Sequence, residues 1–186
     1  MLISFSGAQS TGKSTLLNIL KDYNPDIFIV DEVTRKIKRK FNMPINEDGG
    51  DLTQYMIMND HIANIYRKTY AEHSILDRCA LDGIVYTRWL YDNSKVNVTM
   101  YNAAKHIFTC LINSYDVIFY TDTADVPLED DGERSANVKF REDIVTLFDE
   151  YTEKLNNIVI LSGTVEQRLK TVKETLADKG LDIKIN

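Results

Sequence analysis

The sequence has 186 residues, of which 44% are hydrophobic and 27% charged, a composition typical of a soluble globular protein. The formal net charge of -6 excludes a generally basic nucleic-acid-binding protein, but it leaves room for a local basic patch. No run reaches the ~18 to 20 apolar residues of a membrane span, and the first residues lack a signal-peptide pattern. We therefore expect a single domain over residues 1–186 with no membrane partner.

The residues that most often bind structural metals are few and scattered. Two cysteines, Cys79 and Cys110, and three histidines, His61, His73 and His106, show no zinc-like spacing. We expect reduced thiols and a cytoplasmic location.

The hydrophobic pattern predicts strands that alternate with helices along the chain. The expected strands are residues 1–6, 26–30, 74–77, 116–122 and 157–163. The expected helices are residues 12–23, 31–41, 52–73, 80–92, 99–115, 139–155 and 164–180, with a Pro/Gly-marked loop at 41–51 and an acidic connector at 123–138. Such alternation predicts an α/β fold in which a five-stranded parallel sheet carries helices on both faces.

The loop after the first expected strand has the sequence "GAQSTGKS", which matches G-x-x-x-x-G-K-[ST] between a strand and a helix. Glycines allow the backbone turns, and successive N–H groups then meet phosphate oxygens at a helix N-terminus. Lys13 would contact the β and γ phosphates, and the Ser14 hydroxyl would bind Mg²⁺. The loop predicts a P-loop NTPase fold that binds ATP through Gly7, Gln9, Ser10, Thr11, Gly12, Lys13, Ser14 and Thr15.

Two charged residues, Asp77 and Arg78, end the third expected strand. In a parallel sheet the carboxyl ends of the strands line the ligand crevice, so Asp77 is placed to hold Mg²⁺ and Arg78 to bind phosphate or an acceptor hydroxyl. Asp82 lies one helical turn later and is expected to brace Arg78. A surface ion pair is the alternative for both residues.

Two carboxylates, Asp31 and Glu32, follow the second expected strand, which we place beside the first. There Glu32 could accept the proton of an attacking hydroxyl, and Arg35 lies on the same helix face at i, i+3. The alternative is that Glu32 only stabilises the helix dipole, and Asp31 is the expected helix cap.

The connector after the fourth expected strand has the features of a lid over residues 124–141. Gly132 offers a hinge, and Arg134 and Arg141 offer positive charge for the γ phosphate. A solvated loop is the alternative.

Two other classes of P-loop protein fit less well. A Ras-like switch needs an N-K-x-D-type segment, which the sequence lacks. Motor ATPases carry an apolar strand that ends in Asp-Glu, and "IFIVDE" (residues 27–32) matches that pattern, but it follows the P-loop early for an oligomeric motor.

Five segments occur in an order that resembles a family of small P-loop kinases: "GAQSTGKSTL", "DEVTR", "LDRCALDGIVY", "EDDGERSANVKFR" and "LSGTVEQRL". This family includes the ribosylnicotinamide kinase domain and many phage-encoded nucleoside or nucleotide kinase-like proteins. The sequence is also similar to deoxynucleoside kinases in its carboxylate after strand two and its acidic-Arg pair after strand three.

The resemblance implies roles for several residues. It implies that Glu32 is the general base and that Asp77 and Arg78 contact metal and phosphate, although Cys79 stands where the family usually has Ser. It also implies that Gly163, Thr164 and Val165 lie beside the adenine ring. The oligomeric state stays open, a homodimer being one option.

The acceptor is expected against the long helix that begins near Leu52. Gln54, Tyr55 and Asn59 are candidates to bind a base, although Tyr55 is also a candidate core residue. Together with Asp31, Arg35 and Arg78, the first two form the expected acceptor site.

The segment "RKIKRK" (Arg35 to Lys40) carries five cations, which either form a solvated face or bind phosphates of a nucleotide or polynucleotide. Three functions therefore stay open. They are a kinase acting on a nucleoside or nucleotide, a kinase acting on a hydroxyl carried by DNA or RNA, and a P-loop NTPase without a small acceptor.

Overall fold

The structure of the chain, a computed structural model, describes residues 1–66, 72–123 and 137–185. Its centre is a five-stranded sheet with the order β2-β3-β1-β4-β5, and every neighbouring pair of strands is parallel. The strands are β1 (Leu2–Ser6), β2 (Phe28–Val30), β3 (Ser74–Asp77), β4 (Val117–Thr121) and β5 (Ile158–Leu161). All five residues of β1 are buried, as expected for the middle strand of a sheet with two covered faces.

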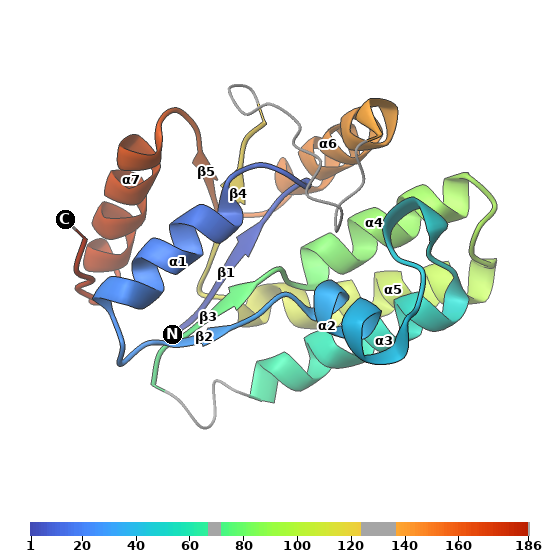
Figure 1. Cartoon of the computed structure of the whole chain (residues 1–186), viewed down its shortest axis with the longest axis horizontal. Helices are drawn as coiled ribbons and strands as arrows, with labels where there is room; N and C mark the ends of the chain where they lie inside the picture. Colours follow the sequence, from blue (N-terminus) through green and yellow to red (C-terminus); the bar gives the residue numbers. More distant parts are fainter. Residues whose placement is uncertain (67–71, 124–136, 186) are drawn as a thin grey trace.

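Helices cover both faces of this sheet (Figure 1). The α-helices are α1 (Lys13–Tyr23), α2 (Val33–Phe41), α3 (Asp51–Ile65), α4 (Ala80–Asp92), α5 (Val98–Leu111), α6 (Val138–Thr152) and α7 (Val165–Asp178). Two short 3₁₀ helices are η1 (Asn46–Asp48) and η3 (Ile112–Ser114). The predicted α/β fold with a parallel sheet and helices on both faces is confirmed.

Alternating side chains of β1 pack into two separate hydrophobic cores, one on each face of the sheet. Ile3 and Phe5 pack with α1 and α7 on one face, where the rings of Phe5 and Phe119 lie 5.1 Å apart. Leu2 packs with α4, α5 and α6 on the other face. This arrangement follows from the two-residue period of a strand, in which successive side chains point to opposite faces of the sheet.

The position of the second strand differs from our expectation. We placed β2 beside β1, but β3 lies between them and β2 is at the edge of the sheet. The edge position agrees with its length of three residues and with the 46% exposure of Phe28. Asp77, at the end of β3, is therefore the carboxylate that ends the strand next to the P-loop strand.

Within the part of the chain that the structure describes, no helix is long and apolar enough to cross a membrane. Cys79 is buried, Cys110 is exposed, and both are free thiols. Gly132, Arg134 and residues 124–136 of the expected lid lie outside the described residues. The end of the expected lid, residues 138–141, forms the first turn of α6.

Candidate active site

The loop between β1 and α1 has the backbone geometry that a phosphate-binding loop requires. Gly7 and Gly12 have φ values of +134° and +82°, a region that favours glycine. A Cβ on Gly7 would lie 2.7 Å from the Thr121 hydroxyl oxygen, so the close approach of β4 also requires glycine there. Thr11 and Thr121 share a hydrogen bond of 2.7 Å between their hydroxyl oxygens, which holds the loop against β4.

Lys13 folds back into this loop. Its Nζ donates to the carbonyl oxygens of Gly7 (2.9 Å) and Ala8 (2.6 Å) and to the Thr11 hydroxyl (3.0 Å). Burial lowers the pKa of Lys13 to about 7, and the nearby positive charge of Arg78 acts in the same direction. An anion placed in the loop would reverse this effect, because it would favour the charged form of the ammonium group.

A buried arginine that the sequence did not indicate joins the P-loop to the segment expected beside adenine. Arg168 of α7 donates to the carbonyl oxygens of Thr11 (2.7 Å), Gly163 (2.9 Å) and Asp122 (3.2 Å). Thr164 begins α7 as its N-cap, with its side chain accepting from the backbone N–H of Gln167. Arg168 therefore holds the 163–165 segment close to the P-loop. A buried cation in an amphipathic helix is a weak sequence signal, since the same residue is ordinarily solvated.

At the carboxyl edge of the sheet, Glu32 lies between two arginines. Its Oε1 accepts from Arg78 Nε at 2.6 Å, and its Oε2 pairs with Arg35 Nε at 2.9 Å. Burial acts to raise the pKa of Glu32, but the charges of Arg78 and Arg35 outweigh it, so the pKa lies below its usual value. Glu32 is also the N-cap residue of α2, so our expectation that Asp31 caps this helix was wrong. The Glu32 side chain makes no capping hydrogen bond, and its two oxygens contact the arginines instead.

Arg78 is held in place from the side opposite Glu32, as expected for a residue braced by Asp82. Its Nη1 pairs with Asp82 Oδ1 at 2.8 Å and donates to the Gly7 carbonyl at 3.1 Å. Asp82 also accepts from the Ser6 hydroxyl (2.7 Å) and the Cys79 N–H (3.0 Å). The guanidinium thus connects the P-loop to Glu32.

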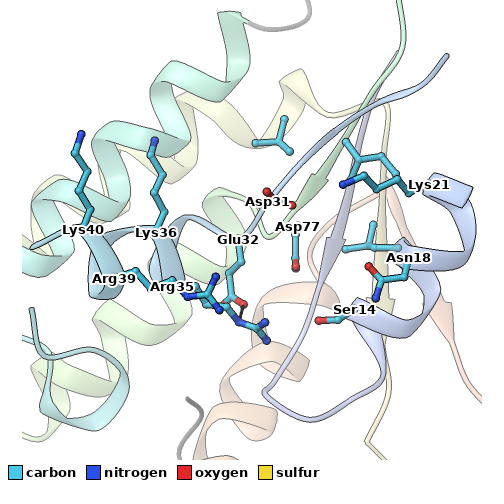
Figure 2. Close-up of a pocket in the computed structure, with 13 residues that line it drawn as sticks. Ser14, Asn18, Lys21, Asp31, Glu32, Arg35, Lys36, Arg39, Lys40 and Asp77 are labelled. Atoms are coloured by element: carbon cyan, nitrogen blue, oxygen red, sulfur yellow. Dashed lines mark ion pairs between the residues drawn. The ribbon is translucent and has the colours of Figure 1, made fainter. Parts of the chain in front are cut away.

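Asp77 and Ser14 line the same space beside Glu32, and Figure 2 shows the Asp77 carboxylate pointing between Glu32 and Ser14. Burial raises the pKa of Asp77 to about 6, and the negative charge of Glu32 adds to the effect. The described residues hold no cluster of three or more His, Cys, Asp or Glu residues that would form an all-protein metal site. Mg²⁺ bound with a nucleotide needs only one or two protein oxygens besides phosphate and water, so Ser14 and Asp77 fit this ion.

A cavity of about 620 Å³ opens beside these residues, between α1 and α2 along β2 (Figure 2). We call it the α1–α2 groove. Arg35 and Asp31 of the expected acceptor site line it. Its complete lining is Ser14, Leu17, Asn18, Lys21, Ile29, Val30, Asp31, Glu32, Arg35, Lys36, Arg39, Lys40 and Asp77.

A second cavity lies behind Arg78, between α2, α3 and α4, and has about 20 Å³, room for about one water molecule. Gln54 lines it and is 2% exposed, and its Oε1 accepts from the Thr87 hydroxyl at 2.9 Å. His61 also lines it, and we did not single out this residue from the sequence. Burial lowers the pKa of His61 to about 4, and its Nδ1 has no hydrogen-bond partner among the described residues.

The other two candidates on α3 point elsewhere. Tyr55 is 45% exposed, so its alternative role as a core residue was wrong. Asn59 is exposed too, and neither residue lines the groove or the cavity behind Arg78.

The arginine at the end of the expected lid reaches the P-loop. Arg141, in the first turn of α6, donates from Nη2 to the Ser10 carbonyl at 3.3 Å. Its predicted partner in the lid, Arg134, lies outside the described residues. One cation of the expected pair therefore contacts the phosphate-binding loop.

The sequence matches the family model described as "AAA domain" over residues 2–168. The chain belongs to this family. Among curated proteins, no sequence matches the chain. The family match, a P-loop domain, and the solved structures below confirm the resemblance to small P-loop kinases.

Solved structures with the same fold include three kinds of protein. A NadR protein in complex with NR superposes with a TM-score of 0.74 at 16% identity, covering 98% of this chain and 52% of that one. Deoxyadenosine kinase from M. mycoides with products dCMP and dCDP superposes with a TM-score of 0.69 at 15% identity, covering 96% of this chain and 100% of that one. Thymidylate kinase from Candida albicans superposes with a TM-score of 0.64 at 17% identity, covering 99% of this chain and 96% of that one. The chain spans about half the length of the NadR chain.

Proposed function

We propose that the protein transfers the γ-phosphate of ATP to a hydroxyl group of a nucleoside or nucleotide. One observation supports this most strongly: Glu32 is fixed by Arg78 and Arg35 beside the P-loop, where an acceptor oxygen would have to lie. The solved structures of nucleoside and nucleotide kinases, which have the same fold, support the same reaction class.

The donor would occupy the loop between β1 and α1. Its phosphates would accept from the loop N–H groups and from Lys13, which would turn outward from the three oxygens that it now contacts. The adenine would lie against residues 163–165, which Arg168 ties to the P-loop. Mg²⁺, held by Ser14 and Asp77, would neutralise charge on the phosphate oxygens. Both free cysteines fit the reducing cytoplasm, where we place this reaction.

Glu32 would orient the acceptor hydroxyl and accept its proton. Its lowered pKa makes it a weak base, which suffices because the loose transition state of phosphoryl transfer depends mainly on positioning and charge neutralisation. Arg78 would balance the charge near the transferred group. A nucleoside base would lie between Gln54, His61 and Arg78, and its entry requires the side chains of this cavity to move apart.

A panel of nucleosides and nucleoside monophosphates with γ-³²P-labelled ATP tests this function. We expect label on at least one acceptor and a matching amount of ADP. Release of labelled phosphate in the absence of any labelled acceptor would instead identify an NTPase, and failure to bind ATP would overturn the donor site itself.

A further inference from the structure

The α1–α2 groove carries a charge opposite to that of the whole protein. Five cations and three carboxylates line it, which gives a net charge of +2, whereas the chain has -6. Ten of the thirteen residues that line it are polar or charged. The five cations are Lys21, Arg35, Lys36, Arg39 and Lys40.

Two helices contribute these residues in matching stripes. On α2 the lining residues follow Glu32 at i+3, i+4, i+7 and i+8, while Val33 and Ile37 turn inward to a small core with Ile57. On α1 the lining residues Leu17, Asn18 and Lys21 follow Ser14 at i+3, i+4 and i+7. Both helices start at the carboxyl edge of the sheet, so the groove begins at the reaction centre and runs away from it.

The length of the stripe favours a chain of phosphates over a single phosphate. From Arg35 to Lys40, the cations that α2 contributes, the helix rises by about 7.5 Å at ~1.5 Å per residue. Phosphates along an extended single strand lie farther apart than the ~3.4 Å per phosphate along the axis of duplex DNA, so the stripe spans about two phosphates. A nucleoside monophosphate has one phosphate and would occupy only part of this stripe.

We propose that the α1–α2 groove binds the phosphodiester backbone of a single-stranded nucleic acid, whose hydroxyl group is then the phosphate acceptor at Glu32. This inference rests on the proposed function and names its acceptor. The acceptor oxygen forms a bond to the γ-phosphorus as the bond from that phosphorus to the β–γ bridging oxygen breaks. ADP leaves, the hydroxyl proton passes to Glu32 and then to water, and the strand gains a phosphomonoester.

Some groove cations already have protein partners, which limits how many can bind the strand at once. Arg35 pairs with Glu32, and Lys36 Nζ lies 3.2 Å from Asp60 Oδ2. Arg39 and Lys40 also make contacts within the protein, and Lys40 Nζ lies 5.1 Å from the centroid of the Phe41 ring. Both cations are nevertheless exposed, and they lie at the far end of α2 from Glu32. These two cations are therefore the best positions to change without disturbing the reaction centre.

Fluorescence anisotropy with a labelled single-stranded oligodeoxynucleotide of about 12 nucleotides tests the groove. The unmodified protein should bind the strand with an affinity that falls as salt rises. In the Arg39→Ala/Lys40→Ala variant we expect binding weaker by about tenfold and a salt slope smaller by about 1.4, because each lost phosphate contact removes ~0.7. The matched variant Lys105→Ala/Lys154→Ala removes two exposed cations outside the groove and should bind as the unmodified protein does.

Three outcomes would overturn the inference, and each is distinct from failure of the proposed function. The first is no strand binding by a protein that binds ATP and phosphorylates a nucleoside. The second is equal loss of binding in both double variants. The third is strand binding without label transfer to the strand while label passes to a mononucleotide. A protein that neither binds ATP nor labels any acceptor would contradict the proposed function itself.

Discussion

Glu32 and Arg78 form a 2.6 Å ion pair between the edge strand β2 and the interior strand β3, and the same guanidinium reaches the P-loop carbonyl of Gly7. β2 does not pair with β1, and the Arg78 side chain instead joins the residue that follows β2 to the loop that follows β1. Arg78 thus holds the carboxylate of Glu32, which follows the edge strand β2, close to the P-loop. Glu32 is the N-cap residue of α2, but its side chain contacts the two arginines and makes no capping hydrogen bond.

If Glu32 positions the acceptor hydroxyl, then Glu32→Gln should lower kcat by roughly 10² or more, because the amide can no longer accept a proton. ATP binding should stay unchanged, since Glu32 lies on the acceptor side. Steady-state kinetics and calorimetry measure the two quantities. An unchanged kcat would reduce Glu32 to a structural partner of the two arginines.

Lys13→Ala should remove transfer, with kcat/KM lower by about 10³, because the charge at the β and γ phosphates is lost. The fold should survive, since burial has already lowered the pKa of Lys13 to about 7 and the folded state gains little from this charge. Circular dichroism and the labelled-ATP assay check both statements. A normal transfer rate would contradict the assignment of the loop.

Asp77→Asn should stabilise the free protein at neutral pH while it lowers activity. Burial and Glu32 raise the pKa of Asp77 to about 6, above the unfolded value near 3.8. The folded state therefore binds more protons between pH ~4 and ~6, and stability falls as pH rises through this window. Above it the substitution should add roughly 1 to 3 kcal/mol to the free energy of unfolding.

Urea denaturation at pH 8 and at pH 4 measures this difference, which should largely vanish at the lower pH. Asp31→Asn is the matched control, because Asp31 is an exposed carboxylate in the same groove. Equal stability of Asp77→Asn and the unmodified protein at pH 8 would show that the buried Asp77 carboxylate does not destabilise the fold.

Most parts of the site that the sequence predicted lie at strand ends, while Gln54 and Arg141 lie on helices. Glycine spacing identifies the P-loop, and residues such as Asp77 and Glu32 directly follow short apolar runs, so a parallel sheet brings them to one edge. Strand order was not predictable in the same way. Nothing local in "DIFIV" distinguishes an edge strand from a neighbour of β1, because the order depends on which helices cover it.

Buried polar residues inside helices were missed for a related reason. Arg168 and His61 are 3% and 1% exposed, yet each stands in an ordinary amphipathic pattern where a polar residue is expected to face water. The sequence indicated only one wall of the groove. The segment "RKIKRK" supplies the cations of α2, whereas Lys21 of α1 was not singled out.

Arg168 should act as a positioning residue for the donor. Arg168→Met leaves three carbonyl oxygens without this donor, one buried and two half-buried, which should cost about 1 to 3 kcal/mol of stability. Because the link between the P-loop and residues 163–165 is lost, KM for ATP should rise about tenfold while KM for the acceptor stays constant. Arg168→Lys keeps the charge but cannot donate to all three carbonyl oxygens in the same way. It should therefore restore most of the stability while KM for ATP stays raised. Parallel rises in both KM values would argue for a general loosening of the fold.

Gln54→Leu should separate acceptor binding from donor binding. Gln54 is 2% exposed in the cavity behind Arg78, where its amide can form hydrogen bonds with a base that leucine cannot form. We expect KM for the acceptor to rise tenfold or more, about 1.4 kcal/mol, with KM for ATP unchanged. Asn59→Leu makes a similar change at an exposed position of the same helix and should leave both KM values as they are. If Gln54→Leu alters neither KM, the base lies outside this cavity and the acceptor approaches Glu32 only from the groove.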